Sequence, residues 1–179
     1  MKKPFFVTFG EWIHEYADCF TSEHKQIGRT KTEKHRIKLI PDAQPVCCPP
    51  RRLQPELERH ARETVDKLLA TGQIRPSRPW PLAIVLTRRK DGSYLFAVDY
   101  RRLNDLTVPD AYPMPRIDEA QSAMDGARFF STFDMACGYW QFDMEEADKE
   151  KTAFVKRDGL FEWNCMPFGL RGALRHIAG

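Results

Sequence analysis

The sequence predicts an α+β domain, because its expected helices and β-hairpins do not alternate strictly along the chain. One helix is expected over residues 55–71 and another over 115–125. Hairpins are expected around Asp91-Gly92 and Asp158-Gly159, since an Asp-Gly turn between two β-rich runs is a strong hairpin signal. Strict alternation of strands and helices would instead have indicated a doubly wound parallel sheet.

Composition indicates a globular protein. The chain has 179 residues, of which 42% are hydrophobic and 30% are charged, and this size allows one domain with a core. No apolar stretch is long enough to span a bilayer, and Gly10 and Glu11 interrupt the short apolar start before a signal-peptide core forms. We therefore expect an intracellular, non-secreted protein without a membrane partner. The net charge of +3 neither requires nor excludes a nucleic-acid partner.

The cysteines do not have the spacing of a zinc site. They form no C-x-x-C pair, and their odd number, which includes one vicinal pair, argues against a secreted disulfide framework. We expect all five to be reduced thiols: Cys19, Cys47, Cys48, Cys137 and Cys165.

The first part of the chain has weak local signals until the first long helix. Residues 11–20 place aromatic side chains at helical spacing, which predicts a short covering helix. Residues 41–55 are rich in proline, and this predicts an extended strap across the domain surface. The helix of residues 55–71 is much better defined, with Pro55 at its first position and Gly72 at its stop. Its apolar stripe consists of Leu57, Ala61, Val65, Leu68 and Leu69.

Residues 127–135, ARFFSTFDM, alternate as a β-strand does and carry Asp134 near their end. One interpretation is that Asp134 begins the next turn as a capping residue. The tight turn that follows, Gly138-Tyr139-Trp140-Gln141, favours a second interpretation. In it, a divalent cation on Asp134 holds a nucleotide triphosphate beside the planar Tyr139 ring.

Seven blocks in order resemble one family, the reverse transcriptases of gypsy-class LTR retrotransposons and their retroviral relatives. The resemblance covers roughly His35 to Leu170 and is strongest from Val98 onward. It implies the fingers and the first half of the palm of a right-hand polymerase, in truncated form. The blocks are PPRRLQP, GQIRPSRPWPLAIVLTRRKDGS, FAVDYRRLND, AYPMPRID, GARFFSTFDMACGYWQF, EKTAF and FEWNCMPFGL.

The resemblance implies a role for individual residues. Asp134 would be a catalytic residue and the first of three carboxylate ligands of Mg²⁺, and Tyr139 would stack beneath the sugar of a deoxynucleoside triphosphate (dNTP). Arg89 or Lys90 would contact the phosphates of that nucleotide, as cations do in phosphoryl transfer. The resemblance also places Phe168 in the nucleotide pocket and Arg101 against the template strand. Template–primer nucleic acid and dNTP are the partners that the family implies, and its location would be cytoplasmic or particle-associated.

Two departures from the family pattern limit the expected activity. Leu95 stands where the family commonly carries an arginine that contacts the nucleotide. Residues 171–179 leave the pattern, and the sequence contains no Asp-Asp dipeptide for the other two metal-binding carboxylates. Because two-metal catalysis needs ligands for a pair of ions, we expect the chain alone not to polymerise DNA. We also expect marginal stability, since the strand of residues 127–135 would lack its partner.

The expected organisation has an N-terminal extension, residues 1–40, then a reverse transcriptase-like part, residues 41–170, and a divergent tail, residues 171–179. An alternative function is a non-catalytic nucleic-acid-binding remnant. Its phosphate contacts would come from three basic runs: Arg51-Arg52, Arg88 to Lys90, and Arg101-Arg102. An unrelated α+β interaction domain is a third hypothesis, which the order of the seven blocks disfavours.

Overall fold

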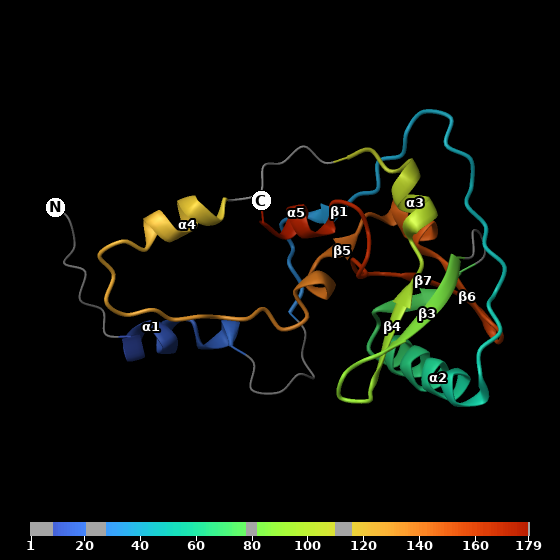
Figure 1. The fold of residues 1–179 in the computed structure, drawn as a ribbon, viewed down its shortest axis with the longest axis horizontal. Coiled ribbons are helices and arrows are strands. Elements are labelled where there is room, and N and C mark those ends of the chain that lie inside the picture. The colour runs from blue at the N-terminus through green and yellow to red at the C-terminus, as the bar shows by residue number, and fades with distance from the viewer. Residues whose placement is uncertain (1–8, 21–27, 78–81, 110–115, 179) are drawn as a thin grey trace.

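A five-stranded sheet with one long helix forms the body of the molecule. The computed structural model describes residues 9–20, 28–77, 82–109 and 116–178. The sheet has the order β2-β7-β6-β3-β4, and α2 (Pro55–Ala70) lies beside it (Figure 1). Its strands are β2 (Ile74–Pro76), β3 (Leu82–Arg88), β4 (Tyr94–Val98), β6 (Phe154–Lys156) and β7 (Gly159–Trp163).

Both predicted hairpins are confirmed. β3 pairs antiparallel with β4, and β6 pairs antiparallel with β7. At the first turn the Asp91 carboxylate accepts hydrogen bonds from the backbone N–H and the hydroxyl of Ser93, and Gly92 has a φ of 85°. A side chain at Gly92 would be strained in this left-handed conformation. The parallel pairing of β3 with β6 joins the two hairpins into one sheet.

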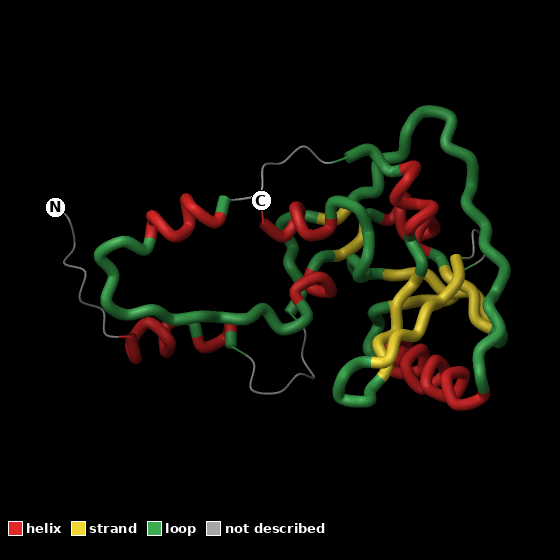
Figure 2. Tube along the Cα trace, in the orientation of Figure 1, coloured by secondary structure: helices red, strands yellow, loops and turns green. Residues whose placement is uncertain are grey.

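The predicted helix of residues 55–71 is confirmed as α2. It has proline in its first turn and ends before Gly72, whose φ is 72°. Its apolar stripe turns Ala61, Val65 and Leu68 into the core. The strap of residues 41–54 contains no helix or strand and runs along the edge of the molecule to the start of α2, as expected (Figure 2).

A smaller layer lies beside the main sheet. β1 (Lys34–His35) pairs in parallel with β5 (Asp143–Met144), and the last helix, α5 (Ala173–Ala178), packs against the turn η2 (Gly138–Gln141). Residues 34–40 therefore pack with the body of the domain. The limits of the three expected parts stay a prediction. The remaining elements of the body are α3 (Arg101–Leu106) and the 3₁₀ segment η3 (Glu146–Thr152).

The predicted strand of residues 127–135 is wrong for this chain. These residues form a loop without a strand partner among the described residues, and the side chain of Phe129 is 93% exposed. The loop follows α4 (Ile117–Ala123) along the chain and passes alongside α1 (Phe9–Glu15) on its way to the body of the molecule (Figure 1). The short turn η1 (Ala17–Cys19) comes directly after α1. A strand needs a ladder partner for its backbone groups, so the alternating pattern alone does not produce one.

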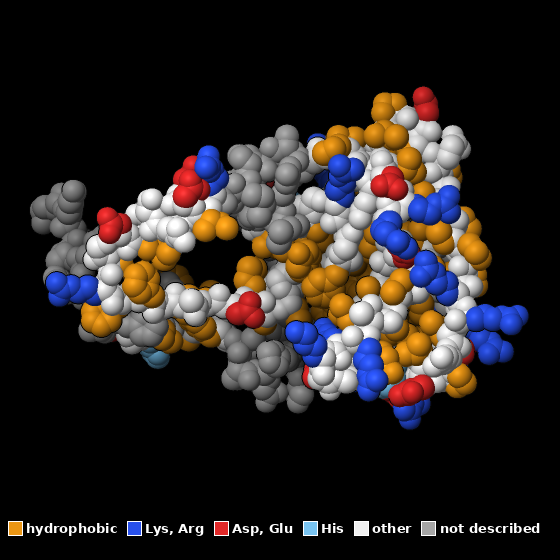
Figure 3. All heavy atoms as spheres, in the orientation of Figure 1, with side chains coloured by type: hydrophobic (Ala, Val, Ile, Leu, Met, Phe, Trp, Pro, Cys, Tyr) orange, Lys and Arg blue, Asp and Glu red, His pale blue; other side chains and the backbone are white. Residues whose placement is uncertain are grey.

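The predicted helix of residues 115–125 is shorter than expected and contributes nothing to the core. It begins at Ile117, Pro115 lies outside the described residues, and none of its side chains is buried. The ring of Phe20 contacts that of Phe133 at a centroid distance of 5.8 Å, which joins the N-terminal turn to the loop. Hydrophobic side chains line the inner edge of this part of the molecule (Figure 3).

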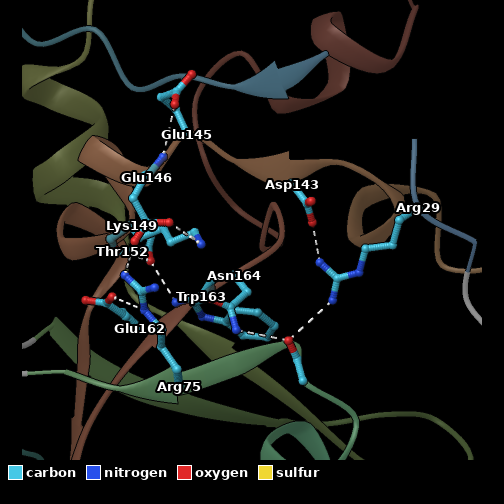
Figure 4. A network of polar contacts seen from close by, with 11 residues as sticks. Arg29, Arg75, Asp143, Glu145, Glu146, Lys149, Thr152, Glu162, Trp163 and Asn164 are labelled. Carbon is cyan, nitrogen blue, oxygen red and sulfur yellow. Dashed lines mark hydrogen bonds and ion pairs between the residues drawn. The ribbon is translucent and has the colours of Figure 1, made fainter. Parts of the chain in front are cut away.

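A polar network ties β2 to β7 and η3. The Arg75 guanidinium donates to Glu162 and to Glu146, each at 2.6 Å (Figure 4). The Ser77 hydroxyl donates to Glu162 at the same distance. Lys149 and then Arg75 hold the pKa of Glu146 at about 2, and the two carboxylates raise the pKa of Arg75. The network fixes the register of the short edge strand β2, which has only three residues.

No helix among the described residues is both long and apolar enough to cross a membrane. The five cysteines are free thiols, and Cys165 is buried. Burial raises the pKa of the Cys165 thiol to about 12, which keeps this side chain in the neutral form.

Candidate functional site

Tyr139 and Phe168 come into direct contact, although 28 residues separate them. Their ring centroids are 4.9 Å apart with the planes tilted by 58°. Tyr139 lies in η2, which begins after Cys137 in a left-handed conformation with a φ of 52°. The Gln141 side chain donates to the Ala136 carbonyl at 2.9 Å and closes this turn. Two residues that the sequence assigns to a nucleotide pocket therefore share one aromatic surface.

Trp140 anchors that surface to the core. Its ring lies 5.7 Å from the ring of Phe168 and 6.0 Å from that of Trp163 on β7. Trp163 is buried, while Tyr139 and Trp140 are half-buried. Because aromatic pairs at these separations stabilise each other beyond the area they bury, the Tyr139 ring has a supported position.

Asn104 is a positioning residue that the sequence interpretation missed. Its amide donates to the Gly169 carbonyl at 2.8 Å, and its side-chain oxygen accepts from the Arg171 N–H at 2.8 Å. Gly169 has a φ of 91°, so this loop also needs glycine at that position. Asn104 thus holds the loop that carries Phe168. No local signal could have identified it, since its partners lie more than sixty residues away along the chain.

Arg101 is held by a carboxylate that the sequence interpretation also missed. Its Nε and Nη2 atoms donate to the two oxygens of Asp99 at 2.8 and 2.7 Å, and Arg51 donates to the same carboxylate at 3.0 Å. Arg101 foremost, with Arg51, lowers the pKa of Asp99 to about 2. Asp99 orients both guanidinium groups, while the Arg101 side chain stays 80% exposed and accessible to a ligand.

Asp99 should contribute to stability in a pH-dependent way. Its folded pKa of about 2 lies below the unfolded value of about 3.9, so the contribution is present above that unfolded value and is lost as the pH falls through about 2. Since Arg101 and Arg51 are solvent-exposed, we expect on the order of 1 kcal/mol. Urea unfolding at pH 6 and pH 2.5 should show a smaller acid loss for Asp99→Asn than for wild type, and Asp105→Asn serves as the exposed control. An equal acid loss in wild type and Asp99→Asn would contradict this role.

Arg89 and Lys90 lie on the β3–β4 turn, where both are exposed. The backbone N–H of Arg89 donates to the Ser93 carbonyl at 2.7 Å, and that of Gly92 donates to Arg89 at 3.1 Å, so the turn itself is well braced. Leu95 lies on β4 opposite Thr87 and is partly exposed. The hairpin presents two cations at its tip and an apolar side chain close behind them.

Asp134 lies in the loop of residues 127–136 and is exposed. Among the described residues, no three His, Cys, Asp or Glu side chains form a group that could hold a metal ion. Mg²⁺ is the usual ion of reverse transcriptases, but a pair of such ions needs several convergent carboxylates. One exposed carboxylate does not fit that requirement, so no catalytic step through a metal ion follows from these residues.

Sequence comparisons identify the family. The family described as reverse transcriptase (RNA-dependent DNA polymerase) matches residues 88–174. The Pol polyprotein of transposon opus from Drosophila melanogaster is 38% identical over 130 residues, or 69% of this chain and 13% of that protein. That of transposon 297 is 32% identical over 167 residues, or 90% of this chain and 16% of that protein. The chain therefore spans less than a fifth of the length of these two relatives.

Solved structures show the same fold. The protease–reverse transcriptase of prototype foamy virus superposes with a TM-score of 0.76 at 19% identity, covering 92% of this chain and 22% of that one. A foamy viral protease–reverse transcriptase in complex with an RNA/DNA hybrid gives a TM-score of 0.72 at 15% identity, with 93% and 22% covered. With its ordered motifs and this fold, the chain belongs to the reverse transcriptase family and carries part of a gypsy-class reverse transcriptase domain.

Proposed function

We propose that residues 1–179 bind template–primer nucleic acid as part of an RNA-directed DNA polymerase and do not extend the primer by themselves. The observation that carries the proposal is the contact of Tyr139 with Phe168 at 4.9 Å. It supports a nucleotide surface made from two of the family motifs. Arg101, exposed and oriented by Asp99, supports a contact with the template backbone.

The cations of the β3–β4 turn support contacts with the phosphates of a dNTP. Arg89 and Lys90 are exposed at the end of a braced hairpin, and a fixed positive charge stabilises a triphosphate better than a freely moving one. The foamy viral relative was solved with an RNA/DNA hybrid, which makes such a hybrid the natural first ligand. Mg²⁺ would be needed for catalysis, and Asp134 would supply only one of its expected ligands.

Binding of a labelled RNA/DNA hybrid, measured by fluorescence anisotropy, tests this function. We expect Arg101→Gln to weaken binding severalfold and to lower the slope of log K against log salt by about 1, as the loss of one phosphate contact does. Arg59→Gln is the matched control, because Arg59 is an exposed arginine on α2. Equal weakening by both substitutions, or none by Arg101→Gln, would contradict the proposal.

The same samples, supplied with Mg²⁺ and all four dNTPs, test the absence of catalysis. We expect no extended primer from the wild-type polypeptide or from Asp134→Asn, because one carboxylate cannot hold the metal pair. Primer extension by wild type that disappears in Asp134→Asn would show that the chain is a complete polymerase.

A further inference from the structure

A stripe of alternating cations crosses one face of the molecule at β1. Residues 34–38 run extended, with the side chains of His35 and Ile37 buried and those of Lys34, Arg36 and Lys38 exposed. Alternate residues of an extended chain lie on the same face, roughly 6.5–7 Å apart. The three cations therefore form a regular row, which we call the basic stripe.

The backbone of the basic stripe is held from both sides. The His35 carbonyl accepts from the Glu145 N–H at 2.9 Å, and the Lys38 carbonyl accepts from the Val108 N–H at 2.8 Å. The Ile37 N–H donates to the Asp148 carboxylate at 3.0 Å. Because these bonds fix the extended conformation, the three cations keep their spacing without a ligand.

The basic stripe borders a cavity of about 790 Å³. Among the described residues, five Lys and Arg side chains line it against two carboxylates, those of Glu33 and Glu145. Both carboxylates already face a cationic or histidine partner, since Glu145 pairs with Arg36 at 3.3 Å and Glu33 lies 3.9 Å from His176. Apart from Arg36, the described cations that line the cavity are Lys31, Lys34, Lys38 and Arg171.

The cations around this cavity are not fully neutralised by neighbouring carboxylates. Among the described residues, Lys31, Lys34 and Lys38 form no ion pair, and the Arg171 guanidinium donates only to the backbone carbonyls of Asn104 and Thr107. Scattered surface lysines are normally just solvated. Here they converge on a hollow, and like charges that converge repel one another until an anion enters.

We propose that the basic stripe and its cavity bind the phosphate backbone of a single-stranded nucleic acid. A row of fixed cations along a groove suits a repeating anion, and a hollow of this volume admits a flexible single strand more readily than a duplex. Among the described residues, no Phe, Tyr or Trp side chain lines the cavity, so this lining offers bases no ring of that kind to stack on. The binding should therefore depend on charge and be insensitive to base sequence.

The test uses the whole 179-residue polypeptide and a fluorescein-labelled twelve-nucleotide single strand. The stripe variant combines Lys34→Gln, Arg36→Gln and Lys38→Gln. We expect it to bind at least tenfold more weakly than wild type, and the slope of log K against log salt to fall by about 2, or about 0.7 for each of three lost contacts. The matched control removes the same charge from the exposed face of α2 with Arg59→Gln, Arg62→Gln and Lys67→Gln.

The outcomes separate this site from a general charge effect. A tenfold loss in the stripe variant alone, with a thermal melt like that of wild type, supports the site. Equal losses in the stripe and control variants, or no loss in the stripe variant, overturn it. Full displacement of the oligonucleotide by tripolyphosphate at the same phosphate concentration overturns the nucleic-acid assignment, because it would show a general polyphosphate site.

The inference stands apart from the proposed function, and the two can fail separately. If Arg101→Gln leaves the affinity for the hybrid unchanged, the proposed template contact is contradicted, and the proposal for the basic stripe is not affected. If the stripe variant binds the single strand as tightly as wild type does, only the proposal for the basic stripe is contradicted. Two different oligonucleotide sequences of equal length should bind the wild-type chain alike, and a large preference for one of them would also count against a backbone site.

Discussion

Replacing Phe154 by alanine should lower the free energy of unfolding by about 3–5 kcal/mol, a large fraction of the stability of a small domain. Phe154 is fully buried on β6, the strand that joins the two hairpins. Its ring lies 5.6 Å from Phe96, 5.8 Å from Phe161 and 6.2 Å from Trp163. Alanine would leave a cavity among these rings. Because β6 is hydrogen-bonded to β3 on one side and to β7 on the other, the strand cannot move to close it.

Urea unfolding followed by tryptophan fluorescence measures this loss. Because Phe154→Ala could fail to fold at all, Phe154→Leu gives a second point, with an expected loss of less than half as much. Leu95→Ala on the edge strand β4 serves as a control, since Leu95 is partly exposed. Similar losses for Phe154→Ala and Leu95→Ala would show that the core is not centred on β6.

The second large effect should come from the loop of residues 127–136. Replacing Phe129, Phe130 and Phe133 by serine should raise the soluble monomeric fraction severalfold. These side chains are 93%, 62% and 59% exposed, and several large exposed apolar side chains on one loop promote association. The substitutions remove no buried contact of the sheet, so the melting temperature of the body should change little. Light scattering after size-exclusion chromatography, over a concentration series, measures the monomer.

A control places serine at two separate, partly exposed apolar positions, Ile40 and Leu95. Their removal should leave association unchanged, because isolated apolar residues on a surface are ordinary. If wild type is already monomeric at high concentration, or if the control variant is equally improved, then the loop is not the origin of association.

Local signals predicted the hairpins and α2, because each is determined by residues close together in the sequence. The Asp-Gly turns and the apolar stripe of α2 needed no distant partner. The prediction of a strand over residues 127–135 was wrong for the opposite reason. An alternating pattern describes only one strand of a pair, and no partner strand lies beside it among the described residues. Sequence periodicity tells which side chains would share a face and does not tell whether a partner strand is present.

The candidate site divides in the same way. The resemblance to the family motifs identified Tyr139 and Phe168, which the structure brings together. Asn104 was missed, since its contacts join residues 65 and 67 positions apart. Asp99 was missed although Arg101 lies only two positions away, because its second partner, Arg51, is 48 positions distant. The pair Arg51-Arg52 was considered as a phosphate contact, whereas the structure ties Arg51 to Asp99 at 3.0 Å. Short motifs indicate which chemistry is available, and only the fold shows which groups support it.

The parallel pairing of β1 with β5 has a consequence for synthesis of the chain. Lys34 on β1 pairs with Asp143 on β5, 109 positions later, and translation at about 5–20 residues per second needs roughly 5–20 s to produce that interval. Residues 34–38 therefore leave the ribosome long before the strand that orders them exists. During that interval their lysines and arginine are carried by an undocked segment, so a nascent chain can meet polyanions before its sheet has closed.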